Sequence, residues 1–225
     1  MKQWEPVLMQ CPMFKHLSTT DIQQTIQDVP YLIETLEKGK IIYRAEETAH
    51  RIGIIISGCL EARKYLPTGN VISLFQRKPG EMIGGSIIFS SHPKYPCDVI
   101  VREKSILLWF DRQVVLGTFL KNPVIASNIM RIFSDRIMQL EKRVELFSFY
   151  SIPKKIAFSL LNDFSIAENQ TIYLPFSKTT WAEYLNVSRT SLSRELKIMC
   201  DQKIISMNKN EIRILQAERL ETLLY

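Results

Sequence analysis

Two arginines with hydroxyl side chains between them stand on one face of a predicted helix near the C-terminal end of the chain. In residues 188–199, SRTSLSRELKIM, the spacing of Leu192, Leu196 and Met199 predicts one buried helical face. An arginine can donate two hydrogen bonds to O6 and N7 of guanine in the DNA major groove. We therefore predict base contacts from the opposite face, through Arg189, Thr190, Ser193 and Arg194.

The residues before this helix predict a tight turn that follows another helix. Ser188 can cap the second helix with its hydroxyl, and Asn186 tolerates the left-handed conformation that such a turn requires. The start of the first helix offers free backbone N–H groups to a phosphate. We predict phosphate contacts from Ser177, Lys178, Lys197 and Lys209.

Two β-rich runs follow, residues 204–207 and 211–215, joined through residues 208–210 in a hairpin turn. The order helix, helix, hairpin is that of a winged helix-turn-helix. The alternative is an ordinary helical hairpin with a solvated basic face, because short motifs depend on their structural context.

The first 115 residues predict a small β-barrel or jelly roll. Ser18 opens a predicted short helix over residues 19–27. Short strand-like runs separated by turn residues then recur, which is typical of a sandwich or barrel. The runs are GKIIYRAEE, RIGIIISGCLEARKYLP, TGNVISLFQRKPGE, MIGGSIIF and CDVIVREKSILLWFD. The fold class is therefore α+β.

The order SRTSLSRELKIM followed by a short wing resembles the Crp/Fnr family of bacterial transcription regulators. The resemblance extends over nearly the whole chain, because the barrel runs, with Ile56-Ser57-Gly58 before a strand and PGEMIGG before a loop, are similar to a cyclic-nucleotide-binding domain. The resemblance also places Thr190 where many relatives carry a glutamate that accepts from cytosine. The preferred half-site is therefore expected to differ from TGTGA.

The chain departs from the nucleotide-binding members of that family at the ligand site. The resemblance places Gly85 where a glutamate binds the ribose, and Tyr95 and Pro96 where arginine and serine hold the cyclic phosphate. Leu140 and Glu141 stand where the long helix of those relatives offers two hydroxyl groups to the adenine base. A phosphate buried without a compensating cation is costly, so cyclic AMP is disfavoured.

No substitute for the missing groups is evident nearby. Glu81 lies four residues before the ribose position, and Arg63 and Arg102 are the nearest cations in the sequence. Another small molecule, or no ligand at all, remains open. The effector pocket is expected around Gly84, Gly85, Ser86, Tyr95, Leu140 and Glu141.

Residues 122–149 predict a long helix with an apolar seam whose members recur at spacings of 4, 4, 3, 4 and 3, close to a heptad pattern. The seam could pack on its own barrel, but the helix is longer than that barrel needs. The family resemblance also implies a dimer. We expect a parallel homodimer through Ile129, Phe133, Ile137, Leu140, Val144 and Phe147.

The end of this helix is marked by Tyr150, Ser151 and Pro153, because proline disfavours helix at the residue before it. We expect a hinge there. The predicted domains are an effector-sensing β-barrel (1–121), a dimerisation helix (122–150) and a winged helix-turn-helix DNA-binding domain (151–225).

Composition agrees with this organisation. The chain has 225 residues, 46% of them hydrophobic, and a formal net charge of +6. No run approaches the roughly 18 apolar residues of a membrane span, and the first ten residues lack a signal-peptide core, so a cytoplasmic protein without a membrane partner is expected. The positive charge suits a polyanionic partner.

The four cysteines show no paired spacing, so neither a zinc site nor a disulfide framework is predicted. One branch of the family holds an iron–sulfur cluster with closely spaced N-terminal cysteines. Only Cys11 lies near that end, so no such cluster is expected, while a redox-active pair involving Cys11 or Cys97 stays open. The remaining cysteines are Cys59 and Cys200.

No catalytic constellation is recognisable. A metal-dependent cupin needs several clustered ligands, but His16, His50 and His92 are far apart and form no HxH motif. His92 alone gives weak support for a haem ligand. The sequence lacks GxSxG, P-loop and GxGxxG motifs, so we predict no enzyme activity, metal or cofactor.

The sequence therefore predicts a homodimeric, sequence-specific DNA-binding regulator that senses an unidentified signal through its barrel. Two recognition helices would enter successive major grooves about 34 Å apart, on a pseudo-palindromic operator. If the protein is an activator, RNA polymerase is a further expected partner. The alternative is a ligand-binding or scaffolding protein without specific DNA binding.

Overall fold

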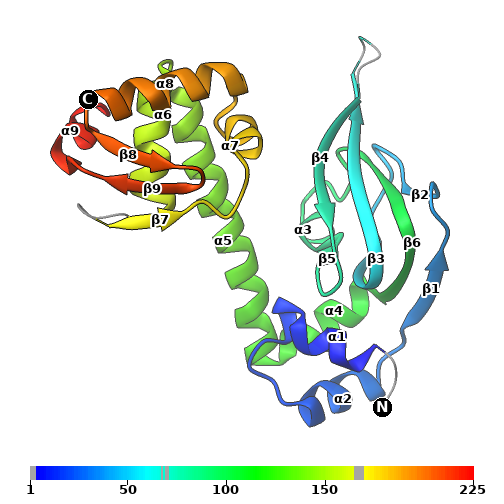
Figure 1. Cartoon of the computed structure of the whole chain (residues 1–225). Helices are drawn as coiled ribbons and strands as arrows, with labels where there is room; N and C mark the ends of the chain where they lie inside the picture. Colours follow the sequence, from blue (N-terminus) through cyan, green and yellow to red (C-terminus); the bar gives the residue numbers. More distant parts are fainter. Residues whose placement is uncertain (1–3, 67, 69–70, 165–169) are drawn as a thin grey trace. The chain divides into compact units, whose positions relative to one another are not determined.

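The computed structural model describes residues 4–66, 68, 71–164 and 170–225, which form two compact units, Met1–Asp135 and Arg136–Tyr225 (Figure 1). The division falls inside a long helix, α5 (Pro123–Ser148), rather than at either of its ends. Among the described residues, no helix combines the length and the apolar character needed to cross a membrane.

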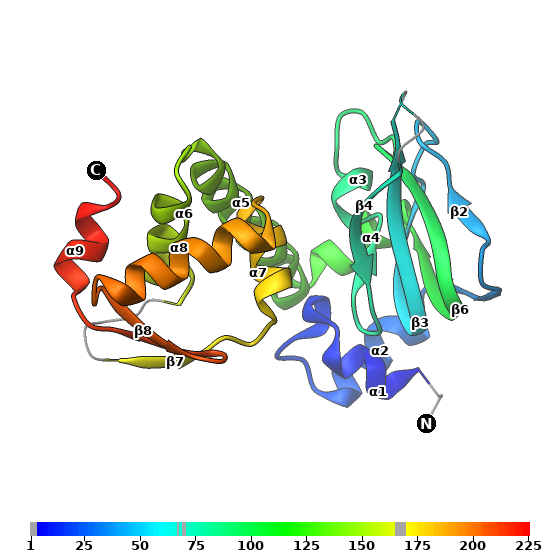
Figure 2. The same cartoon turned by 45° about the horizontal axis from the view of Figure 1, so that its top comes forward.

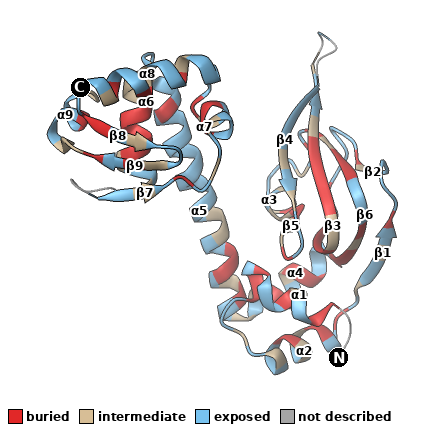
Figure 3. Ribbon diagram, in the orientation of Figure 1, coloured by how far each residue is buried: buried red, intermediate tan, exposed pale blue. Residues whose placement is uncertain are grey.

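The N-terminal unit is built on an antiparallel sheet of jelly-roll type. Its strands are β1 (Leu32–Leu36), β2 (Ile41–Tyr43), β3 (Arg51–Tyr65), β4 (Val71–Arg77), β5 (Met82–Ile83) and β6 (Asp98–Asp111). The order is β1-β6-β3-β4, with β2 also paired to β6 and β5 to β3. The long strands β3 and β6 carry most of the buried positions (Figure 3). The predicted jelly-roll fold is confirmed.

Two parts of the sheet differ from the prediction. The run MIGGSIIF forms a strand only at Met82–Ile83, because Gly84 takes a left-handed conformation with φ of 79° and starts the short helix α3 (Gly85–Ile88). The edge strand β1 was not predicted. Its side chains are mostly exposed and do not alternate, so its sequence lacks the usual period of two.

Short helices cover the N-terminal core: α1 (Glu5–Gln10), η1 (Pro12–Phe14), α2 (Thr19–Gln27), α4 (Arg112–Gly117) and η2 (Phe119–Lys121). The predicted start of α2 is confirmed, since Ser18 and Asp21 form a reciprocal capping box. Phe14, Phe110 and Phe119 pack edge to face in the core below the sheet.

The two ends of helix α5 pack into different cores. The side chain of Asn122 accepts hydrogen bonds from the amides of Val124 and Ile125, at 3.0 and 3.3 Å, and so caps its start. Ile125 and Ile129 are buried in the N-terminal core, and Leu146 is buried in the C-terminal core. The last turns of α5 therefore fold with the C-terminal unit, upstream of the predicted hinge.

The C-terminal unit combines helices with a small antiparallel sheet (Figure 2). Its elements are α6 (Ile152–Phe158), the π-helical turn η3 (Ser159–Asp163), β7 (Thr171–Tyr173), α7 (Lys178–Leu185), α8 (Arg189–Asp201), β8 (Ile205–Asn208), β9 (Glu211–Ile214) and α9 (Ala217–Thr222). The predicted winged helix-turn-helix is confirmed.

The wing itself is slightly shifted from the prediction. Strand β8 ends at Asn208, so the turn consists of Lys209 and Asn210, with Lys209 in the left-handed conformation. A third strand, β7, pairs with β9 at the start of the wing and was not predicted. Its three residues are too few to show a pattern.

Candidate nucleic-acid interface

The helix-turn-helix is held by local bonds that its sequence indicated. The hydroxyl of Ser177 accepts from the amide of Thr180 at 3.2 Å, and that of Ser188 accepts from the amide of Ser191 at 3.0 Å. Both hydroxyls therefore cap their helices. Between the helices, Asn186 is left-handed with φ of 52°. The predicted cap at Ser188 and the predicted turn at Asn186 are confirmed, whereas the cap at Ser177 was not predicted.

Helix α8 has one buried face and one exposed polar face. Leu192, Leu196 and Met199 are at most 2% exposed and pack into the core of the C-terminal unit. The side chain of Arg194 is 72% exposed, and its only short ionic contact among the described residues is with Glu195 at 3.7 Å. The exposed face consists of Arg189, Thr190, Ser193, Arg194 and Lys197.

One member of this face has a local partner. The hydroxyl oxygens of Thr190 and Ser188 are 2.8 Å apart, so Thr190 takes part in the cap of its own helix. A base contact through Thr190 would have to share or replace this bond. Thr190 is therefore less free to approach DNA than Ser193.

A cationic hollow of about 540 Å³ lies beside the first turn of α8. Lys178 comes from the start of α7, Arg189 from the start of α8 and Lys209 from the tip of the wing, and none of the described residues that line the hollow carries a carboxylate. The hollow therefore contains three of the four residues that were predicted to contact DNA phosphates. It also contains Arg189, which was predicted to contact bases. The lining is Leu174, Pro175, Phe176, Ser177, Lys178, Thr179, Arg189, Lys209 and Asn210.

The predicted effector residues are divided between the two units. Gly84, Gly85, Ser86 and Tyr95 belong to the N-terminal unit, whereas Leu140 and Glu141 stand exposed on the second half of α5. An effector pocket that combines all six residues therefore stays a prediction.

Tyr95 is a core residue in this structure. It is 1% exposed and stacks on Tyr43 with 4.0 Å between the ring centroids. A Cβ atom added to Gly84 would lie 2.9 Å from the Tyr95 hydroxyl, so the glycine leaves room for the phenol. This hydroxyl is buried without a hydrogen-bond partner among the described residues, and burial raises its pKa. An aromatic ring thus takes up the space beside Gly84.

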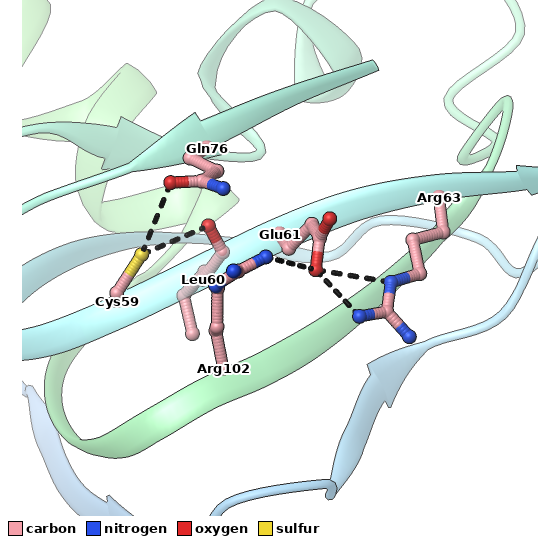
Figure 4. Close-up of polar contacts among 6 residues, drawn as sticks. All are labelled: Cys59, Leu60, Glu61, Arg63, Gln76 and Arg102. Carbon is pink, nitrogen blue, oxygen red and sulfur yellow. Dashed lines mark hydrogen bonds and ion pairs between the residues drawn. The ribbon is translucent and has the colours of Figure 1, made fainter. Parts of the chain in front are cut away.

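The cations nearest to this region in the sequence are already bound to carboxylates. Glu61, itself buried, accepts from Arg63 at 2.7 Å and from Arg102 at 3.2 Å (Figure 4). The hydrogen bond from Arg63 holds the pKa of Glu61 below its usual value. Neither arginine is left to compensate a buried phosphate.

A third arginine, Arg51, was not singled out from the sequence. Its Nε donates to the hydroxyl of Tyr43 at 3.1 Å, its guanidinium lies 4.0 Å from the ring centroid of Trp109, and it pairs with Glu34 at 3.6 Å. Arg51 therefore supports the same aromatic stack from the side of β3. An arginine at the start of a long apolar strand gives no signal of this role.

The predicted dimer seam divides at the boundary between the units. Ile129 is only 4% exposed, and Phe133 packs edge to face on Phe89 in the N-terminal unit. The first turns of α5 cover their own core, so the burial of Ile129 disfavours its predicted contact with a partner, which stays a prediction. The rest of the seam is open, at 45–71% exposure: Ile137, Leu140, Val144 and Phe147.

The cysteines show no metal or disulfide chemistry among the described residues. Cys11, Cys59 and Cys97 are buried free thiols, and burial raises the pKa of Cys11 to about 11. A thiol with such a pKa is a poor nucleophile at neutral pH because little thiolate is present.

Comparison with known proteins agrees with the two units. Residues 33–122 match the family model of the cyclic nucleotide-binding domain, and residues 154–223 match that of the Crp-like helix-turn-helix domain. The probable transcriptional regulator flp of Lacticaseibacillus casei is 24% identical over 212 residues, which cover 93% of this chain and 94% of that protein. The global nitrogen regulator of Nostoc sp. is 23% identical over 206 residues, which cover 89% of this chain and 92% of that protein.

Structural comparison gives the same fold. The crystal structure of the catabolite activator protein of Thermus thermophilus superposes with a TM-score of 0.56 at 18% identity, covering 95% of this chain and 98% of that chain. With a jelly-roll unit, a long helix and a winged helix-turn-helix in this order, the chain belongs to the Crp/Fnr family of transcription regulators, with a cyclic-nucleotide-binding-like sensor domain and a Crp-like DNA-binding domain.

Proposed function

We propose that this protein is a homodimeric regulator that binds a pseudo-palindromic DNA operator through α8. The observation that carries the proposal is the exposed polar face of α8 beside the cationic hollow. Arginines on that face are long enough to reach guanine in the major groove, and the helix has a separate apolar face for its own core.

The hollow would receive the DNA backbone. Lys178, Arg189 and Lys209 converge there from three elements, and Ser177 caps the adjoining helix, whose free N–H groups also favour an anion. Contacts to phosphate position a protein on DNA, whereas contacts to base edges provide specificity. Arg189 lies between these two regions, so it could serve either role.

The dimer would form through the open part of the α5 seam. Ile137, Leu140 and Val144 line a shallow apolar depression of about 410 Å³ on the second half of α5. Exposed apolar side chains at heptad spacing are typical of a helix that pairs with a copy of itself. A second copy would place two recognition helices on two half-sites.

Salt dependence tests the phosphate contacts. If Lys178 neutralises one phosphate per subunit, Lys178→Ala should reduce the slope of log affinity against log salt by about two for the dimer. Arg219→Ala serves as the control, since Arg219 lies in α9 and donates to Gln202 at 3.3 Å. Fluorescence anisotropy with a labelled duplex measures both slopes, and equal slopes would contradict this assignment.

The effector of this regulator should not be a cyclic nucleotide. Tyr95 is buried beside Gly84, Arg63 and Arg102 are held by Glu61, and Arg51 pairs with Glu34, so each of these three arginines already has a carboxylate partner. Calorimetric titration with cyclic AMP or cyclic GMP should show no binding at micromolar concentrations. Saturable binding in that range would overturn this conclusion.

A further inference from the structure

Lys155, in α6, is the one charged residue that is buried among the described residues of the C-terminal unit. It is 8% exposed, and its Nζ donates to the backbone carbonyl of Leu185 at 3.0 Å. Leu185 is the last residue of α7 and is itself fully buried. The bond therefore joins α6 directly to the turn of the helix-turn-helix.

The carbonyl of Leu185 needs such a donor. The last carbonyls of a helix have no partner within the helix, and a buried one cannot bond to water. At the end of α7, the amides of Asn186 and Val187 bond to the earlier carbonyls of Glu183 and Ala182, at 3.1 and 3.0 Å. These bonds reverse the chain at Asn186, and the carbonyl of Leu185 is left to Lys155.

The other surroundings of the ammonium group do not explain its burial. Its Nζ lies 5.9 Å from the ring centroid of Phe147 in α5, and no carboxylate pairs with Lys155 in the described part of the chain. Burial of an unpaired charge is costly unless directional bonds offset it. A methionine would fill a similar volume without that cost.

We propose that Lys155 is a positioning residue that fixes the turn between α7 and α8, and through it the first turn of the recognition helix. Ser188 and Arg189 follow Leu185 within four residues, so a shift of the turn moves the residues that would face DNA. The ring of Phe147, on the open part of the seam, has its centroid 5.9 Å from the ammonium group. Lys155 thereby contacts both α5 and the end of α7 from its place in α6.

This inference rests on the proposed DNA binding, and the neighbouring residue provides a matched control. Lys154 also donates from Nζ to a backbone carbonyl, that of Leu224 at 3.1 Å, near the C-terminal end of the chain. Lys154→Met and Lys155→Met therefore remove the same kind of bond from adjacent positions of one helix. Only the second bond reaches the helix-turn-helix.

The experiment compares wild type, Lys155→Met, Lys155→Arg and Lys154→Met in binding to a specific and to a scrambled duplex. We expect Lys155→Met to weaken specific binding at least tenfold and non-specific binding less than twofold. Lys155→Arg, which keeps a donor, should recover most of the specific affinity, and Lys154→Met should change it less than twofold. Equal effects of the two methionine variants, or no recovery with arginine, would overturn the proposal.

A measurement on the wild type decides the matter if Lys155→Met does not fold. The buried ammonium group should give a slowly exchanging NMR signal coupled across its hydrogen bond to the Leu185 carbonyl carbon. A rapidly exchanging, uncoupled signal would overturn the proposal. Failure of the wild type to prefer any duplex would refute the proposed DNA binding instead, and the NMR result would still stand alone.

Discussion

The two units use their polar residues in opposite ways. In the C-terminal unit, Arg189 and Arg194 are exposed on α8, Lys178 at the start of α7 is half-buried, and none of the three lies in the core. In the N-terminal unit, Glu61 and Tyr95 are buried, and Arg63 and Arg102 are bound to Glu61. The C-terminal unit thus keeps these three charges available for a partner. In the N-terminal unit, by contrast, Glu61, Arg63 and Arg102 are paired with one another.

Under the proposed function, one fold carries a DNA-binding surface without a site for a buried phosphate. The recognition surface requires only that exposed side chains extend from a stable helix. A site for a buried phosphate requires both space and an unpaired cation in the interior, which is costly to maintain without the ligand. Filling the space with Tyr95 removes that cost.

The largest effect is expected from a substitution that disrupts the proposed dimer. Ile137→Asp would place two like charges against each other in the seam, and burying each ion alone costs several kcal/mol. The variant should be monomeric by light scattering and should bind a palindromic duplex more than a hundredfold more weakly. Met138→Asp is the control, because Met138 is as exposed (56% against 55%) but lies off the seam. A dimeric Ile137→Asp protein would place the interface elsewhere.

The next effect concerns base reading by the exposed charges. Arg194→Ala should cost about 1–3 kcal/mol on the preferred site and flatten the preference at one base pair, because a bidentate contact to guanine would be lost. Binding to a scrambled duplex should weaken much less. Competition titrations with single-base variants of the site measure both quantities. A variant that keeps full specificity would show that Arg194 contacts only the backbone.

A smaller effect tests the filled interior of the N-terminal unit. Tyr95→Phe removes a buried hydroxyl that has no partner among the described residues, so its free energy of unfolding should stay equal or rise by about 1 kcal/mol. Tyr43→Phe removes the acceptor of the Arg51 bond and should lower the free energy of unfolding by about 1 kcal/mol. Urea denaturation compares the two. A destabilised Tyr95→Phe variant would reveal a partner for that hydroxyl.

The smallest effect is the pH dependence due to Glu61. Its pKa is lowered in the folded state, so its stabilising contribution is present above the pKa of an ordinary glutamate and is lost as the pH falls through the lowered folded value. Glu61→Gln should therefore be less stable than wild type at pH 7. The difference should shrink in acid below about pH 4. A constant difference across this range would mean that the carboxylate charge contributes nothing.

Local features of the interface could be predicted from the sequence, because they depend on residues close together in the chain. The caps at Ser177 and Ser188 and the turn at Asn186 follow from side-chain chemistry at fixed positions. The buried face of α8 follows from its period. The meeting of Lys178 with Lys209 required the fold, since these residues are separated by two helices and a strand.

Other features gave no usable signal. Lys155 directly follows another lysine, and two adjacent lysines predict a pair of solvent-exposed side chains. Lys155 is nevertheless buried. The sequence MIGGSIIF predicts a continuous strand that includes Gly84 and Gly85. In the structure, the left-handed backbone at Gly84 ends the strand and starts a helix. The seam residue Ile129 has the same spacing as its open neighbours, so only packing could assign it to the core.

Selection of bound duplexes from a random pool is the decisive test of dimeric, sequence-specific DNA binding. We expect enrichment of two inverted half-sites whose centres are about one helical turn apart, with a half-site other than TGTGA, and loss of the paired pattern with Ile137→Asp. Recovery of TGTGA would contradict the assigned reading by α8. No enrichment, or a single unrepeated site for the wild type, would contradict the claim that this protein is a dimeric, sequence-specific DNA-binding regulator.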